Sequence, residues 1–155
     1  MLTLLMSTLM MSTPALAEEP SVTEILADAT KSALNVEVMV IHATTEHTKK
    51  DESIKHLLKY FANYKYTGYK LLKEHKSELN DKQDQSFTLP GELKMKVSIL
   101  SHNDKQAKVL VKITDVKGTH NYLDSTITVP RNNNFMVAGP KYDGGILILP
   151  LSVKY

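Results

Sequence analysis

The sequence predicts an α+β fold, a mainly antiparallel β-sheet or sandwich with one packed helix after the first strand. Two observations lead to this prediction. From Gln85 onward, segments with alternating apolar and polar residues are separated by turn residues, which is typical of strands with one buried and one wet face. Only one helical pattern lies inside this body of the chain, and it follows a short apolar run at Val36–Ala43.

The N-terminal part is predicted to lie outside the folded domain. Residues 1–17 form an apolar run that ends in Pro14 and the small-residue pattern Ala15-Leu16-Ala17, which is typical of a secretory signal peptide. Ser21 and Glu24 then have the spacing of a capping box, and a helix is expected from about Val22 to Ala33. The expected organisation is a signal peptide over 1–17, a helix and linker over 18–35, and one domain over 36–155.

Composition limits the function classes. An apolar fraction of 42% and a charged fraction of 23% are ordinary for a globular domain, and a net charge of +2 gives no indication of nucleic-acid binding. The absence of Cys excludes disulfides and thiolate chemistry. No second stretch is apolar and long enough to span a membrane, so we expect a periplasmic or secreted protein without a transmembrane segment after cleavage.

The segment around the predicted helix reads as strand, helix, strand. Val36–Ala43 is apolar on both faces, which predicts a central strand. Ile54, Leu57, Leu58 and Phe61 recur at helical spacing, with Asp51 or Ser53 as the cap. Because the connection is long, the next strand, at 69–72, is expected to run parallel to the first one.

The pairing of the next two strands is constrained by parity. In Leu93–Ile99 and Ala107–Ile113, apolar residues alternate with polar ones. Only a loop with an odd number of residues, for example three with a bulge, keeps apolar residues opposite each other. The register then places Lys112 opposite Lys94 or Lys96, so the outer face of this hairpin should be basic.

The C-terminal third is expected to contain three more strands. Leu123–Val129 alternates and ends at Pro130, and a last hairpin joins Phe135–Ala138 to Ile146–Val153 around a loop at 139–145. Glycines in that loop suit a tight turn with positive φ angles. Pro150 cannot donate to a ladder, so it is expected at an edge or a bulge.

No pattern predicts catalysis, a metal or a cofactor. The six His residues show no paired ligand spacing, although the loop with Glu46, His47, Asp51 and Glu52 could wrap an ion. Asp115, Asp124 and Asp143 could form an acid-base pair, but their spacing does not indicate one. No nucleophile or phosphate-loop motif is present, so we expect a protein that is not an enzyme.

Residues that could contact a partner are Tyr and Lys side chains. Tyr next to Lys can anchor a protein interface or stack on a sugar, although tyrosines at this spacing can equally fill the space between helix and sheet. Lysines on a sheet face can meet an anionic partner or simply keep the sheet soluble. The candidate partner-binding residues are Tyr64, Tyr66, Lys94, Lys96, Lys112, Lys141 and Tyr142.

Longer stretches resemble known sequences. VMVIHAT, YKLL, TLPGELKMKV and VAGPKYDGGILILPL resemble small, functionally uncharacterised secreted proteins of Gram-negative bacteria, and the resemblance implies a fold and a compartment but no site. The stretch VPRNNNFMVAG is also similar to a strand-turn-strand of secretin-type envelope proteins.

Three functions follow as hypotheses. The first is a non-catalytic periplasmic module that binds or assembles an envelope protein, for example as an accessory of a secretion, pilus or motility machine. The second is a small ligand-binding protein or enzyme with a pocket between helix and sheet, with His42 or Tyr69 at its mouth. The third is a secreted polysaccharide-binding protein. The sequence leaves open whether the chain forms a homo-oligomer.

Overall fold

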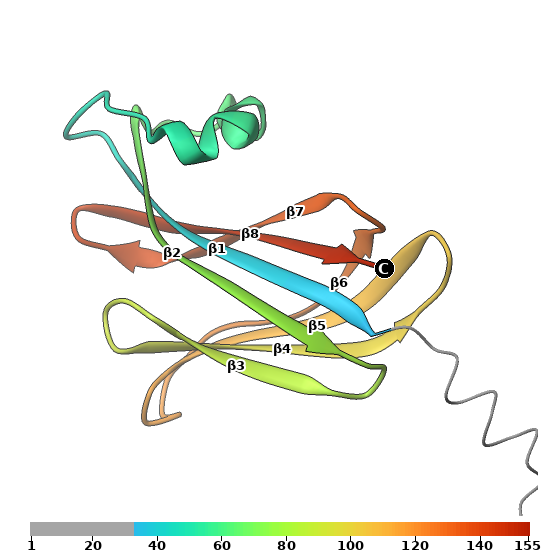
Figure 1. Cartoon of the computed structure of the whole chain (residues 1–155). Helices are drawn as coiled ribbons and strands as arrows, with labels where there is room; N and C mark the ends of the chain where they lie inside the picture. The colour runs from blue at the N-terminus through green and yellow to red at the C-terminus, as the bar shows by residue number, and fades with distance from the viewer. Residues whose placement is uncertain (1–32) are drawn as a thin grey trace, which may run out of the picture. The chain divides into compact units, whose positions relative to one another are not determined.

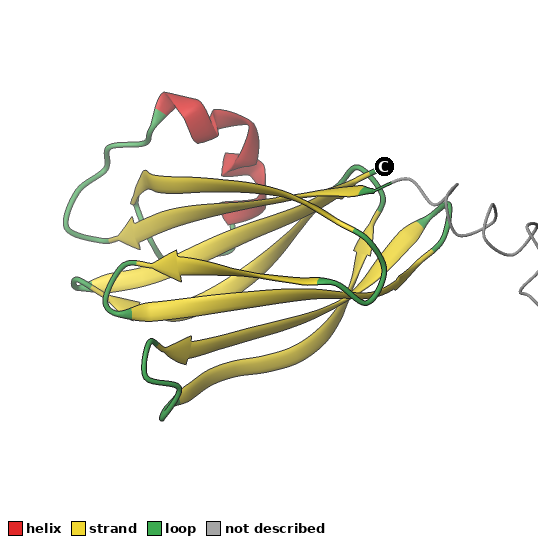
Figure 2. Cartoon of the chain, turned by 60° about the horizontal axis from the view of Figure 1, so that its bottom comes forward, coloured by secondary structure: helices red, strands yellow, loops and turns green. Residues whose placement is uncertain are grey.

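The described part of the chain is a β-sandwich of two four-stranded antiparallel sheets (Figures 1 and 2). The computed structural model describes residues 33–155, so the predicted signal peptide and N-terminal helix lie outside the described residues, except for Ala33. Within this range the predicted mainly antiparallel sandwich with one helix after the first strand is confirmed. The elements are β1 (Leu34–Thr44), the 3₁₀ helix η1 (Glu52–Phe61), β2 (Gly68–Leu79), β3 (Asp84–Leu89), β4 (Leu93–His102), β5 (Gln106–Asp115), β6 (Asn121–Pro130), β7 (Asn134–Tyr142) and β8 (Gly145–Lys154).

The main core lies between the two sheets. The first sheet has the strand order β2-β1-β8-β7 and the second has the order β3-β4-β5-β6. Alternate residues of the central strands point inward and are fully buried, as the pattern in β4 and β5 predicts. The buried inner faces include Val36 and Val38 of β1, Met95 and Val97 of β4, and Val109 and Val111 of β5.

A second apolar cluster covers the outer face of the first sheet. Ile54, Leu57 and Phe61 of η1 are buried against Ile41 and Ile148. The Asp51 side chain accepts a hydrogen bond from the Ser53 amide at 3.1 Å, which confirms the predicted cap. β1 and β8 are therefore apolar on both faces because the other sheet covers one face and η1 covers part of the other.

The predicted parallel pairing of the strands on either side of η1 is wrong. β1 and β2 pair antiparallel, from Leu34↔Leu79 to Thr44↔Gly68. The chain after η1 turns back instead of crossing over, and η1 is an insertion between two neighbouring antiparallel strands. Within residues 33–155, parallel pairing is limited to an isolated bridge of Lys50 with Tyr69. The strand also continues to Leu79, well past the predicted end.

The predicted register of the β4–β5 hairpin is confirmed. A three-residue loop at 103–105 and a bulge at Leu100 keep Val97 opposite Val111, and Lys96 lies opposite Lys112. The outer face carries these lysines, but neighbouring strands supply carboxylates. The Lys96 ammonium lies 2.7 Å from Asp84 on β3, and Lys112 lies 3.2 Å from Asp124 on β6.

The last hairpin is tighter than predicted. β7 continues through Gly139 to Tyr142, so only Asp143 and Gly144 form the turn, and Tyr142 pairs with Gly145. Both turn residues have positive φ, 41° and 70°, which a type I′ turn requires. The predicted seven-residue loop is wrong in length, whereas the predicted positive φ angles are confirmed.

Pro150 lies in a central strand rather than at a sheet edge. β8 is hydrogen-bonded to β1 on one side and to β7 on the other. Its ladder with β1 is interrupted between Val38↔Leu151 and Ile41↔Ile148, which is where Pro150 lies. The sheet thus accommodates a residue without an amide hydrogen by leaving a gap in one ladder.

Truncation of Leu57 should separate the helix–sheet contact from the main core. Leu57 is fully buried between η1 and the first sheet, so Leu57→Ala should lower the free energy of unfolding by about 3 kcal/mol. Leu58→Ala is the matched control, because Leu58 is a partly buried neighbour on the same helix. It should lower the free energy of unfolding clearly less than Leu57→Ala. Urea unfolding measures both changes, and equal costs would show that η1 does not pack as described.

Gly145 should tolerate no side chain. A Cβ atom there would lie 1.9 Å from the Ala43 carbonyl oxygen, so Gly145→Ala must push β8 away from β1. Gly118 lies in a turn with open space around it, so Gly118→Ala should cost only about 1 kcal/mol, the backbone strain of a residue with a Cβ at its φ of 73°. Thermal unfolding should show a markedly larger loss for Gly145→Ala. A similar melting temperature for the two variants would contradict the close strand contact.

Candidate functional site

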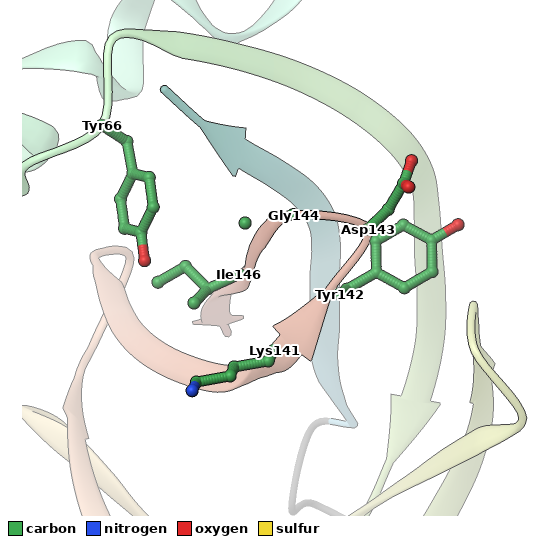
Figure 3. Close-up of a pocket in the computed structure, with 7 residues that line it drawn as sticks. Tyr66, Lys141, Tyr142, Asp143, Gly144 and Ile146 are labelled. Atoms are coloured by element: carbon green, nitrogen blue, oxygen red, sulfur yellow. The ribbon is translucent and has the colours of Figure 1, made fainter. Parts of the chain in front are cut away.

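A hollow lies between the loop after η1 and the β7–β8 hairpin (Figure 3). Its volume is about 440 Å³, within the range of small-ligand sites. We call it the hairpin hollow. It is lined by Tyr66, Lys141, Tyr142, Asp143, Gly144, Gly145 and Ile146.

Strand pairing decides which side chains face the hollow. Lys141 lies opposite Ile146, so both side chains lie on the outer face of the first sheet, the face that carries η1. Figure 3 shows the Tyr66 ring close to Ile146, with Lys141 extending along the hairpin below them. Tyr142 and Asp143 lie on the side of the hairpin away from Tyr66. The side chains that a ligand in the hollow would contact are therefore those of Tyr66, Ile146 and Lys141.

The hairpin is held in place from the other face. His42 of β1 donates from Nε2 to the carbonyl oxygen of Tyr142 at 3.1 Å, and the two rings meet edge to face with centroids 5.4 Å apart. Tyr142 also packs against the main core and lies beside Gly91, in the β3–β4 turn of the other sheet. Tyr142 thus fixes the position of the turn while Lys141 faces the solvent.

Charges of both signs surround the turn. Lys141 and Asp143 are exposed, and an ideal Cβ on Gly144 would lie 2.8 Å from a carboxylate oxygen of Glu46. The hollow thus has an apolar floor at Ile146, an aromatic wall at Tyr66, and a rim with the Lys141 ammonium and the Asp143 carboxylate, while Glu46 lies beside the turn next to Gly144. Such a mixture can receive a side chain or a small polar ligand, with the ring providing contact area and the rim providing orientation.

The structure separates the candidate residues into three places. Tyr66, Lys141 and Tyr142 line the hairpin hollow. Lys94, Lys96 and Lys112 lie on the outer face of the other sheet, where Lys96 and Lys112 form ion pairs. Tyr64 packs with its ring edge to face against Phe61, at 6.2 Å between centroids, so it extends the cluster beneath η1.

Side chains fill the contact between helix and sheet. Tyr69 is buried, its ring stacks on Phe61 at 4.8 Å, and its hydroxyl donates to the Tyr66 carbonyl oxygen at 3.0 Å. Burial raises the pKa of the Tyr69 hydroxyl, so it stays protonated. Tyr69 therefore holds the loop that carries Tyr66 in place.

Other candidates for chemistry are dispersed. Within residues 33–155 no three His, Asp or Glu side chains converge on a point where they could hold a metal ion. Asp115 accepts hydrogen bonds from the Thr119 and His120 amides in the β5–β6 turn, Asp124 pairs with Lys112, and Asp143 lies in the β7–β8 turn. The same stretch contains no helix with the length and apolarity needed to cross a bilayer.

His75 is a partly buried titratable group away from the hollow. It lies on β2, its ring is 4.9 Å from that of Phe87 on β3, and its Nε2 atom has no hydrogen-bond partner among the described residues. Burial lowers the pKa of His75, and the charge of nearby Lys73 adds to this effect. The imidazole is therefore held neutral where the edges of the two sheets meet.

Acid should destabilise the protein partly through His75. The pKa of His75 in the folded protein lies below its unfolded value of about 6.5. Below pH 6.5 the unfolded chain therefore binds a proton that the folded protein does not bind, and the free energy of unfolding falls until the pH has passed through the folded pKa. Above pH 6.5 the imidazole is neutral in both states and the full stability is present. His75→Phe should remove this part of the decline, whereas His56→Gln at an exposed position should not. Urea unfolding at pH 7.5 and 5.0 measures the difference. An unchanged pH dependence in His75→Phe would show that the imidazole is not held neutral.

Comparison with known proteins gives no relative from which to infer a function. No family model matches the chain, and neither the curated proteins nor the solved structures contain a match. The functional argument therefore depends on the geometry of this chain alone.

Proposed function

We propose that this chain is a non-catalytic binding module of the cell envelope and that the hairpin hollow is its contact site for a protein partner. The observation that carries the proposal is that Tyr66, Lys141 and Ile146 line the same open hollow. They come from two segments that are more than seventy residues apart in the sequence. The signal-peptide pattern at residues 1–17 supports the envelope as the compartment.

The chemistry of the hollow suits a protein side chain better than a metal or a phosphate. An aromatic ring and an aliphatic floor favour an apolar anchor, and tyrosines with this kind of surrounding are frequent hot spots of protein interfaces. Lys141 at the rim favours a carboxylate next to that anchor, while Asp143 and Glu46 disfavour a multiply charged anion. The expected partner segment presents an apolar residue flanked by Asp or Glu.

The structure also gives this site a rigid base. The hairpin is fixed by the His42–Tyr142 contact, and the Tyr66 loop is fixed by the Tyr69 hydroxyl. A prepositioned site loses little conformational entropy on binding, so a small contact area can still give useful affinity. An accessory role in a larger envelope machine, in which one component docks on another, is consistent with such a site.

The proposal is tested by substitutions that alter the hollow without altering the core. Tyr66→Ala and Lys141→Glu should each lower capture of the partner from an envelope fraction about tenfold, which corresponds to about 1.4 kcal/mol. Lys94→Glu is the matched charge control, because it is exposed on the outer face of the other sheet. Melting temperatures should confirm that all variants fold. If both hollow variants still captured the partner, or if Lys94→Glu lost capture instead, the hairpin hollow would not be the contact site.

A polysaccharide is the alternative ligand that one observation favours. An aromatic ring beside Lys and Asp side chains can stack on a sugar and bind its hydroxyl groups. The same variants on a glycan array distinguish the two ligands. Binding of the unmodified chain to a glycan, with loss in Tyr66→Ala, would replace the protein partner by a sugar.

A further inference from the structure

The sandwich has four sheet edges, and three of them carry features that block pairing with another chain. β2 has a bulge at Leu72 and is rich in charged residues, and the 49–51 segment covers its first part through hydrogen bonds of Tyr69 with Lys49 and Asp51. β3 has only six residues. β7 contains Pro140 and an irregularity between Ala138 and Lys141. Short length, charges, bulges and Pro are the usual protections of an edge.

β6 has its one bulge at Tyr122, next to its start, and lacks these protections from Leu123 to Val129. It is ten residues long, Asp124 is its one charged residue, and Pro130 lies only at its end. Among residues 33–155 no strand pairs with its outer side. Leu123 and Ile127 are only partly buried and pack on the main core from the rim of the sandwich. An edge of this kind is a template for a further strand.

The direction of the free amide groups can be assigned. The amide of Arg131 donates to the Lys105 carbonyl oxygen at 2.8 Å, toward β5. Since backbone groups alternate along a strand, odd-numbered residues back to Leu123 point toward β5, and the even-numbered ones point outward. Asp124, Thr126 and Thr128 therefore present free N–H and C=O groups, and Pro130, which has no N–H, occupies an outward position.

We propose that a second copy of this chain pairs with β6, antiparallel, about a two-fold axis through Ser125. This register places Asp124 opposite Thr126 of the second copy and Thr126 opposite its Asp124, so outward-facing backbone groups meet and form about four central hydrogen bonds. It also places Leu123 opposite Ile127 on the inner face, where each covers the exposed rim of the other.

Neighbouring registers are less suitable. A shift by one residue in one chain would place inner-face residues opposite outer-face residues. An axis through Asp124 would place the two Asp124 carboxylates opposite each other, and like charges at this position repel. An axis through Thr126 would place Ser125 opposite Ile127 and Leu123 opposite Val129, which is already fully buried in the protomer, so the exposed rim at Ile127 would face a polar residue. Among these registers, the one about Ser125 best covers the partly exposed Leu123 and Ile127.

Substitution at Thr126 tests the register by charge. Thr126 is exposed on the outer face, so Thr126→Asp and Thr126→Lys should leave the protomer folded. In the dimer, Thr126→Asp creates two Asp–Asp pairs and should raise the dimer dissociation constant about tenfold, whereas Thr126→Lys creates two pairs with Asp124 and should lower it several-fold. Thr88→Asp on β3, the other edge of this sheet, is the control and should change nothing.

Sedimentation equilibrium of the full chain over a range of concentrations measures these constants. The proposal is overturned if the unmodified chain stays monomeric, or if Thr126→Asp and Thr126→Lys shift the equilibrium equally.

A cross-link tests the position of the axis. The chain has no Cys, so Ser125→Cys introduces a single thiol, which would meet its counterpart at a Cα–Cα distance of about 4.5 Å, compatible with a disulfide. Mild oxidation should give a covalent dimer of Ser125→Cys much faster than of Ser77→Cys on the protected β2 edge. Equal rates for the two variants would contradict pairing through β6.

Discussion

The burial of both faces of the β2-β1-β8-β7 sheet is the constraint on which the rest of the structure depends. Its central strands carry apolar residues on both sides, and in an isolated two-layer sandwich one of these faces would meet water. The η1 insertion provides the missing layer through Ile54, Leu57 and Phe61. The other sheet has one wet face, and its outer lysines pair with carboxylates on neighbouring strands. The sandwich is therefore a three-layer structure over part of its area and a two-layer structure elsewhere.

This third layer also creates the hairpin hollow. The chain leaves η1 and must return to the edge of the sheet at Gly68, and on the way it passes over the end of the β7–β8 hairpin with Tyr66. Tyr69, which packs beneath η1, binds the carbonyl oxygen of Tyr66 and so fixes this loop. Packing of the helix, position of the loop and shape of the hollow thus depend on the same cluster of buried side chains.

Much of the fold follows from the sequence because period-two alternation is strong in β4, β5 and β6, and helical spacing is clear in η1. Parity limited the β4–β5 hairpin to two registers, and the structure has the one with Lys112 opposite Lys96. The second half of β2 was missed because an edge strand with the composition KEHKSEL buries little and has no clear alternation. The direction of β2 was also missed, since the length of a connection permits a crossover but does not require one.

The site was predictable only in part. Tyr66, Lys141 and Tyr142 were identified by residue type, but sequence spacing could not show that the loop after η1 reaches the last hairpin. Recognition of Asp143-Gly144 as a type I′ turn would have fixed Lys141 opposite Ile146 and separated it from Tyr142. The contribution of Glu46 gives no sequence signal, because it depends on where the 45–51 loop folds.

Hydrogen exchange of individual backbone amides, followed by NMR, tests the central claim most directly. If β1 and β8 are buried on both faces, their hydrogen-bonded amides should be the slowest in residues 33–155 and should exchange only by global unfolding, while the outward amides of η1 exchange sooner. Exchange of the Ile41, Ala43 and Ile148 amides at the rate of the η1 amides would show that the helix layer opens with this part of the sheet, which would contradict the account.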